Sequence, residues 1–184
     1  MKKTTIITLV IILCSTVCNA QRMYNGQSAL QLTISSVDGA FSQNTLSWAV
    51  SLQYNRYTQN GQWLAAAEYA GMRSKYANTY LPYSQITAGG GYAWRIWSTY
   101  NKKVALHGGG LILFGHEHVS SLPDGIYTSC DSRMIYGIAP SISLDMFISR
   151  DIALTLQVKE NITLNSDITN NHTIAGIGVK YLIN

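Results

Sequence analysis

Most of the chain alternates bulky side chains with small or polar ones, and this two-residue period limits the possible folds more than any other feature. In residues 45–55, every second side chain from Leu46 to Tyr54 is bulky, and those between are small or polar. Successive side chains of a β-strand point to opposite faces, so each such segment predicts a strand with one apolar face. Eight segments of this kind follow one another without a helical period: residues 30–35, 45–55, 63–73, 85–96, 104–114, 137–146, 152–159 and 175–183.

The connections between these predicted strands alternate in length. The second, fourth and sixth are short turns, and Asn60-Gly61 in the first of them is a hairpin signal. The other connections include three long loops. The predicted short turns are residues 58–61, 98–102 and 149–151, and the predicted long loops are residues 74–82, 115–131 and 160–171. Short turns at one end and long loops at the other are typical of bacterial outer-membrane barrels, whose short turns face the periplasm.

Aromatic residues agree with this arrangement. They lie near both predicted ends of the barrel: Tyr54, Trp63 and Trp94 near short turns, and Tyr76, Tyr80 and Tyr83 near a long loop. Tyrosine and tryptophan gather where a membrane meets water, so these positions predict two aromatic girdles.

The composition of the polar face indicates which way the apolar face points. A soluble up-and-down barrel would alternate equally well, but its outer face would be rich in charge. Here only 12% of the residues are charged, against about 25% in soluble domains. Small residues, including the glycine triplets at 89–91 and 108–110, suit the crowded interior of a narrow barrel. We therefore predict an all-β fold, an eight-stranded antiparallel up-and-down outer-membrane β-barrel, with lipid contacting Leu46, Trp48, Val50, Leu52, Ile142, Leu144, Leu154 and Leu156.

The N-terminal segment has the features of a secretory signal peptide. Lys2 and Lys3 precede an apolar stretch at residues 6–17 that is too short to span a bilayer, and the small residue Ala20 ends the segment. We predict that residues 1–20 are removed, leaving residues 21–184 as a single barrel domain with Cys130 as its one cysteine. Loss of the two lysines lowers the formal charge from +4 to +2, and no basic block remains to favour direct nucleic-acid binding.

Short motifs along the predicted barrel point to a family. They are LQLT at 30–33 with VDG at 37–39, NG at 60–61 with EY at 68–69, SQITA at 84–88 leading into GGY at 90–92, and GIGVKYLIN at 176–184. Together they resemble the TraO family of conjugative transposon transfer proteins. The resemblance implies a component at the outer-membrane end of the transfer apparatus, in contact with outer-membrane lipid and other conjugative transfer proteins. An eight-stranded barrel is filled by its own side chains, so we expect a non-enzymatic scaffold or surface-contact role without a cofactor.

Two rival functions come from other classes of protein. In the segment HEHVS at 116–120, His118 could activate Ser120 in a lipid A-modifying outer-membrane enzyme, although no carboxylate is clearly placed to orient the imidazole. His116 and His118 could share a metal with Cys130 only if the loop folded back. The second rival is a soluble periplasmic carrier barrel. We predict no catalytic, metal or cofactor site.

Five charged residues fall on the small, polar face of the predicted strands: Glu68, Arg95, Asp145, Lys159 and Lys180. An unpaired charge inside a narrow barrel would be costly, because it loses its hydration and gains no partner. We therefore predict that several of these side chains form a network within the lumen.

Overall fold

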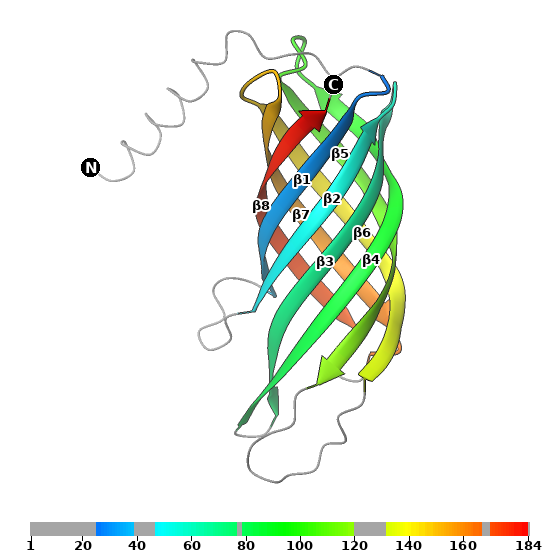
Figure 1. Ribbon diagram of the computed structural model, residues 1–184, viewed down its shortest axis with the longest axis vertical. Coiled ribbons are helices and arrows are strands. Elements are labelled where there is room, and N and C mark those ends of the chain that lie inside the picture. Colours follow the sequence, from blue (N-terminus) through cyan, green and yellow to red (C-terminus); the bar gives the residue numbers. More distant parts are fainter. Residues whose placement is uncertain (1–24, 39–46, 77–78, 120–131, 167–169, 184) are drawn as a thin grey trace, which may run out of the picture.

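A computed structural model describes residues 25–38, 47–76, 79–119, 132–166 and 170–183. The predicted signal peptide lies outside these residues. Eight antiparallel strands form one closed barrel in sequence order, and β1 pairs with β8 to complete it (Figure 1). The strands are β1 (Ser28–Val37), β2 (Trp48–Tyr57), β3 (Gly61–Tyr76), β4 (Thr79–Ser98), β5 (Val104–Val119), β6 (Ser132–Phe147), β7 (Ile152–Leu164) and β8 (Asn171–Ile183). The predicted fold class is confirmed. Within the described ranges, no helix has the length and apolarity needed to span a membrane.

Several strands continue beyond their predicted ends, so all three predicted long loops are shorter than expected. β3 and β4 pair as far as Tyr76 and Thr79, which makes most of the predicted loop 74–82 a hairpin of strands. β5 continues to Val119, and residues 160–164 belong to β7. The alternation of bulky and small residues fades in these segments because they extend past the apolar belt. Backbone ladder hydrogen bonds need no apolar face, so pairing continues there.

The outer surface of the barrel is apolar. The predicted lipid-facing residues lie on this face: Trp48, Leu52, Ile142 and Leu156 are exposed, Val50, Leu144 and Leu154 are partly exposed, and Leu46 lies outside the described residues. Leu52 exposes 54% of its surface and Ile142 exposes 57%. In water such a surface would be unfavourable over its whole circumference, whereas against hydrocarbon it costs nothing.

Aromatic side chains form a belt on the outer face near the short turns. Tyr92 lies between Trp63 and Trp94, with ring centroids 5.0 and 5.1 Å away. Near the other end, Trp48 packs against Tyr69 at 5.6 Å. The prediction that Tyr83 belongs to a girdle is wrong, because its side chain points inward and is buried. The side chains of Tyr76 and Tyr80 lie outside the description of the structure.

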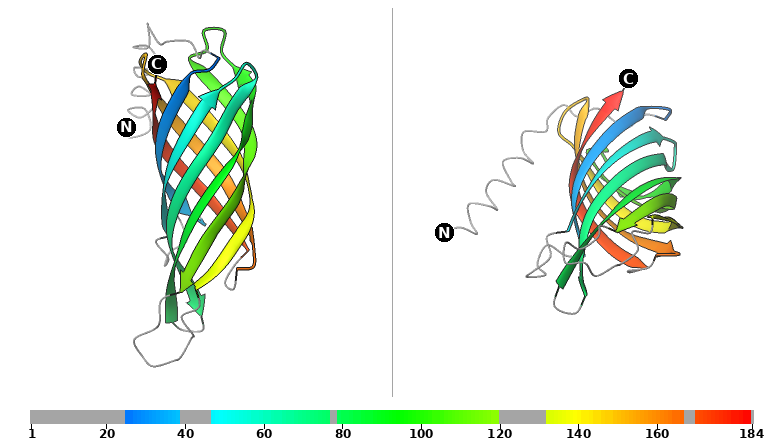
Figure 2. Two further views of the ribbon diagram at one scale, coloured as in Figure 1. Left: turned by 45° about the vertical axis from the view of Figure 1, so that its right-hand side comes forward. Right: turned by 60° about the horizontal axis from the view of Figure 1, so that its bottom comes forward.

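Small and polar side chains fill the interior, as the alternation predicts. The interior also contains three apolar clusters among the described residues: one at the short-turn end around Phe147, one at the long-loop end around Met72, and one around Leu111. Glycine is required where inward positions approach a neighbouring strand. At Gly91, for example, an added Cβ would meet the Leu111 Cα at 2.7 Å. Both views in Figure 2 show the strongly tilted strands that surround this interior.

Candidate functional site

The most deeply buried polar group in the described barrel surrounds Asp145, near the short-turn end. Lys180 Nζ on β8 lies 2.7 Å from Asp145 Oδ2 on β6, and both side chains are fully buried. Thr155 on β7 donates a hydrogen bond of 2.8 Å to Asp145 Oδ1. His107 Nδ1 on β5 lies 3.4 Å from the same carboxylate. Four consecutive strands therefore converge on one carboxylate, which ties that side of the barrel together.

Apolar side chains seal this group from the short-turn end. Tyr57 lies with its ring centroid 5.6 Å from Lys180 Nζ, close enough for a cation–π contact. Phe147 and Leu182 belong with Tyr57 to one buried cluster, together with three alanines. The Lys180 ammonium thus has the Asp145 carboxylate as its charged partner and no access to water, which makes the pair depend on both members.

A second ion pair lies nearer the long-loop end. Lys159 Nζ on β7 is 2.6 Å from Glu68 Oε2 on β3, and both side chains are buried. Asn161, two residues further along β7 on the same face, donates a hydrogen bond of 3.1 Å to Glu68 Oε1. β3 and β7 are not neighbours in the sheet, so this pair crosses the lumen and blocks it.

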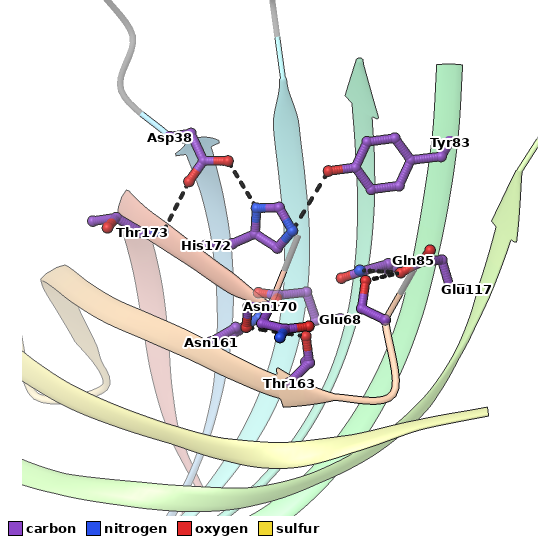
Figure 3. Close-up of polar contacts among 11 residues, drawn as sticks. Asp38, Glu68, Tyr83, Gln85, Glu117, Asn161, Thr163, Asn170, His172 and Thr173 are labelled. Carbon is purple, nitrogen blue, oxygen red and sulfur yellow. Dashed lines mark hydrogen bonds and ion pairs between the residues drawn. The ribbon is translucent and has the colours of Figure 1, made fainter. Parts of the chain in front are cut away.

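Glu117 and His172 anchor the polar groups at the long-loop end (Figure 3). Gln85 and Ser166 each donate a hydrogen bond to Glu117 Oε2, at 2.9 and 2.8 Å. In the β5–β6 ladder, Glu117 also faces Arg133 in register. The two hydrogen bonds hold the buried Glu117 carboxylate of β5 between β4 and the segment that follows β7.

His172 on β8 lies between Asp38 and Tyr83 (Figure 3). Its Nδ1 is 2.7 Å from Asp38 Oδ2, and its Nε2 is 3.5 Å from the Tyr83 hydroxyl. Asp38 Oδ1 also accepts a hydrogen bond of 3.0 Å from the Thr173 backbone N–H. Asp38 adopts a φ of 54°, a left-handed conformation that aspartate tolerates at the end of a strand. This arrangement closes the seam between β1 and β8 and packs β4 against it.

The structure brings four of the five predicted lumen charges together, as the separate pairs Glu68–Lys159 and Asp145–Lys180. Arg95 joins neither pair. Its Nη2 donates a hydrogen bond of 2.6 Å to the Gln59 carbonyl in the first short turn. A register shift between Arg95 and Trp97 interrupts the β4–β5 ladder at this position. Arg95 is therefore close to the end of the barrel, where its long side chain reaches the turn.

The alternation in residues 104–114 places His107 on the polar face, but the predicted lumen network did not include it, and sequence reasoning missed Glu117 and His172 as interior residues. The alternation could have identified Glu117, because it occupies an inward position of β5 like His107. His172 follows a segment that was predicted to be a loop, so its face could not be read from the pattern. β8 in fact begins at Asn171 and turns His172 inward.

The predicted catalytic candidate does not gather into a reactive arrangement among its described residues. HEH at 116–118 lies on β5, so the strand period turns both histidines outward and Glu117 inward. His116 Nδ1 is 2.9 Å from the Ser132 hydroxyl. Ser120 and Cys130 lie outside the described residues. Across the part of the chain that the structure describes, no three His, Cys, Asp or Glu side chains are grouped to hold a metal.

Residues 25–183 match the family described as conjugative transposon protein TraO. No curated protein matches the chain. The barrel is similar to Ail, the attachment invasion locus protein of Yersinia pestis, solved alone and in complex with the heparin analogue sucrose octasulfate. Identity is 16% and 17%, the TM-score is 0.54 for both, and each match covers 87% of this chain and 100% of Ail.

A third similar structure is Neisserial surface protein A, with 10% identity and a TM-score of 0.49, over 86% of this chain and 97% of that one. At such low identity, the likeness to Ail concerns the fold alone. This chain has the fold of small outer-membrane β-barrels.

Proposed function

This chain belongs to the TraO family of conjugative transposon proteins, and on that premise we propose that it is a non-enzymatic component of the transfer apparatus in the outer membrane. Family membership supports a role in conjugative transfer. The location is supported by the barrel's continuous apolar outer face, on which residues such as Leu52 and Ile142 are more than half exposed. The proposed location rests mainly on this apolar outer face, because such a surface is favourable against hydrocarbon and unfavourable in water.

Within the apparatus, we propose that the protein acts by contact as a scaffold or surface component. The interior supports this reading, since the Glu68–Lys159 pair crosses the lumen and the Asp145 group fills it nearer the short-turn end. A strand of DNA has no path through such an interior. The segments free to meet other transfer proteins are then the loops and strand ends that project from the membrane.

Deletion of the gene in donor cells tests the proposal. We expect transfer of the element to be lost, lipid A to remain unchanged by mass spectrometry, and transfer to return with a plasmid copy of the parent chain. The same copy should fractionate with outer membranes and migrate differently on a gel before and after boiling, as folded barrels do. Normal transfer from deletion donors would contradict the transfer role, and altered lipid A would favour the enzymatic rival.

A matched pair of complementing variants connects transfer to membrane insertion. Leu52→Arg places a charge on the lipid-facing surface between the aromatic belt near the short turns and the Trp48–Tyr69 pair, whereas Tyr100→Arg places one at a fully exposed position in a short turn. We expect Leu52→Arg to reduce both the outer-membrane fraction and transfer, and Tyr100→Arg to change neither. Equal tolerance of both variants would argue for a soluble barrel.

A further inference from the structure

The hairpin between β3 and β4 projects beyond the rest of the barrel wall (Figure 2). Pairing of β3 with β2 ends at Gly71 opposite Trp48, and pairing of β4 with β5 ends at Tyr83 opposite Val119. The β3–β4 ladder nevertheless continues for five more pairs, from Met72↔Tyr83 to Tyr76↔Thr79. We call residues 72–76 and 79–83 the ribbon. Among the described residues, no strand pairs with either outer edge of the ribbon past these points.

The base of the ribbon is held firmly. Met72 and Tyr83 are buried in the apolar cluster at the long-loop end, and the Tyr83 hydroxyl contacts His172. The paired segment extends from this base for roughly 14 Å, at about 3.4 Å per residue. An edge that is already paired within a hairpin needs less ordering when a partner binds, which lowers the entropic cost of binding.

The two edges of the ribbon differ because Pro82 lies in β4. Proline has no backbone N–H, so it is accommodated where that N–H would point away from the paired strand. Pro82 lies opposite Arg73, which makes this a pair whose backbone groups point outward. The same alternation turns the N–H groups of Arg73 and Lys75 to the free edge of β3. The β4 edge has lost the corresponding donor at Pro82, so β3 offers the more complete ladder.

The charge of the ribbon indicates what can pair with it. Its sequence contains Arg73 and Lys75 and no acidic residue. Two copies joined edge to edge would bring like charges together, which disfavours self-association. A strand with acidic side chains would meet complementary charge as well as free backbone donors and acceptors.

We propose that the β3 edge of the ribbon is a docking site for an extended, acidic segment of another protein of the transfer apparatus, which adds to the sheet as an extra strand. This inference rests on the proposed function and names the surface through which that function operates. By the barrel rule, the long-loop end faces the cell exterior, so the partner segment is expected outside the outer membrane.

Photo-crosslinking in donor cells tests which edge is occupied. A photoreactive phenylalanine replaces Tyr76 on β3 in one strain and Tyr80 on β4 in a matched strain. We expect the probe at Tyr76 to capture a protein encoded by the element, and the attached peptide to carry net negative charge. The probe at Tyr80 should give little adduct. Adducts between two copies of this chain, or equal capture from both positions, would overturn the proposal.

Proline substitutions test the backbone ladder itself. Lys75→Pro removes an N–H that points to the free β3 edge and spares the hairpin bonds, whereas Tyr80→Pro does the same on the blocked β4 edge. Loss of a ladder hydrogen bond should lower adduct yield and transfer about tenfold for Lys75→Pro, with little change for Tyr80→Pro. Both variants must keep the heat-dependent gel mobility of the parent, which is expected because the ribbon lies outside the closed barrel.

The outcomes separate this inference from the proposed function. If deletion donors transfer normally, the transfer role itself is wrong. If deletion abolishes transfer and folded Lys75→Pro restores it fully, the transfer role stands and the docking edge is wrong.

Discussion

Removing the Asp145 carboxylate should destabilise the barrel more than any other single change to its interior charges. In Asp145→Leu, the Lys180 ammonium stays fully buried and loses its carboxylate partner, and its contact with the Tyr57 ring at 5.6 Å remains. Breaking a buried ion pair in this way costs about 3–5 kcal/mol. The unfolding equilibrium constant should therefore rise by roughly a hundredfold to a few thousandfold. The carboxylate's own bonds to Thr155 and Lys180 are lost in the same step.

The assay is urea unfolding of the mature chain in phospholipid vesicles, followed by tryptophan fluorescence and by the gel shift on boiling. The double variant Asp145→Leu with Lys180→Met should recover most of the loss, because an apolar pair of similar volume needs no counter-charge. Glu160→Leu, which removes an exposed carboxylate from β7, is the control and should change stability little. The reasoning is refuted if Asp145→Leu is as stable as the parent, or if the double variant is no more stable than the single one.

Three further changes probe other parts of the barrel. Leu52→Arg should lower the free energy of unfolding in vesicles by about 2–4 kcal/mol, and Tyr100→Arg should leave it unchanged. Gly91→Ala should lower the free energy of unfolding by about 1–3 kcal/mol through overpacking, because the added Cβ would meet the Gly110 carbonyl carbon at 2.9 Å. Gly90→Ala should be tolerated in the same unfolding assay, because the nearest neighbour of its added Cβ is 3.6 Å away. His118→Ala should leave the lipid A mass spectrum and transfer frequency unchanged, since its ring lies on the opposite face of β5 from the Glu117 carboxylate; a change in lipid A would revive the enzymatic rival.

The fold was predictable because most interior positions obey one simple constraint. A narrow barrel admits mainly small or polar side chains on its inner face and exposes its outer face to hydrocarbon. The two-residue period therefore predicts both which segments are strands and which of their side chains point outward. That signal fades where strands leave the membrane. The β3–β4 hairpin beyond Arg73 was therefore predicted to be a loop, although its backbone pairs as far as Tyr76.

The interior charges were predictable in identity but not in pairing. Alternation placed Glu68, Lys159, Asp145 and Lys180 on the inner face, yet partners such as Glu68 and Lys159 come from strands that are not adjacent. Which charges meet depends on barrel closure and strand stagger, which no local pattern encodes. Arg95 shows the same limit, since the register shift beside it is not visible in the sequence.

Interior and exterior thus serve different purposes, and the Asp145→Leu, Lys180→Met double variant can separate them. If the buried ion pair only holds the barrel together, a double variant that inserts normally should support transfer as well as the parent does. The opposite result is expected for the ribbon, because Lys75→Pro should leave the barrel folded and reduce transfer. A double variant that is folded but inactive in transfer would instead place a functional requirement inside the lumen. That result would contradict the proposed contact role and would assign the buried charges a direct part in transfer.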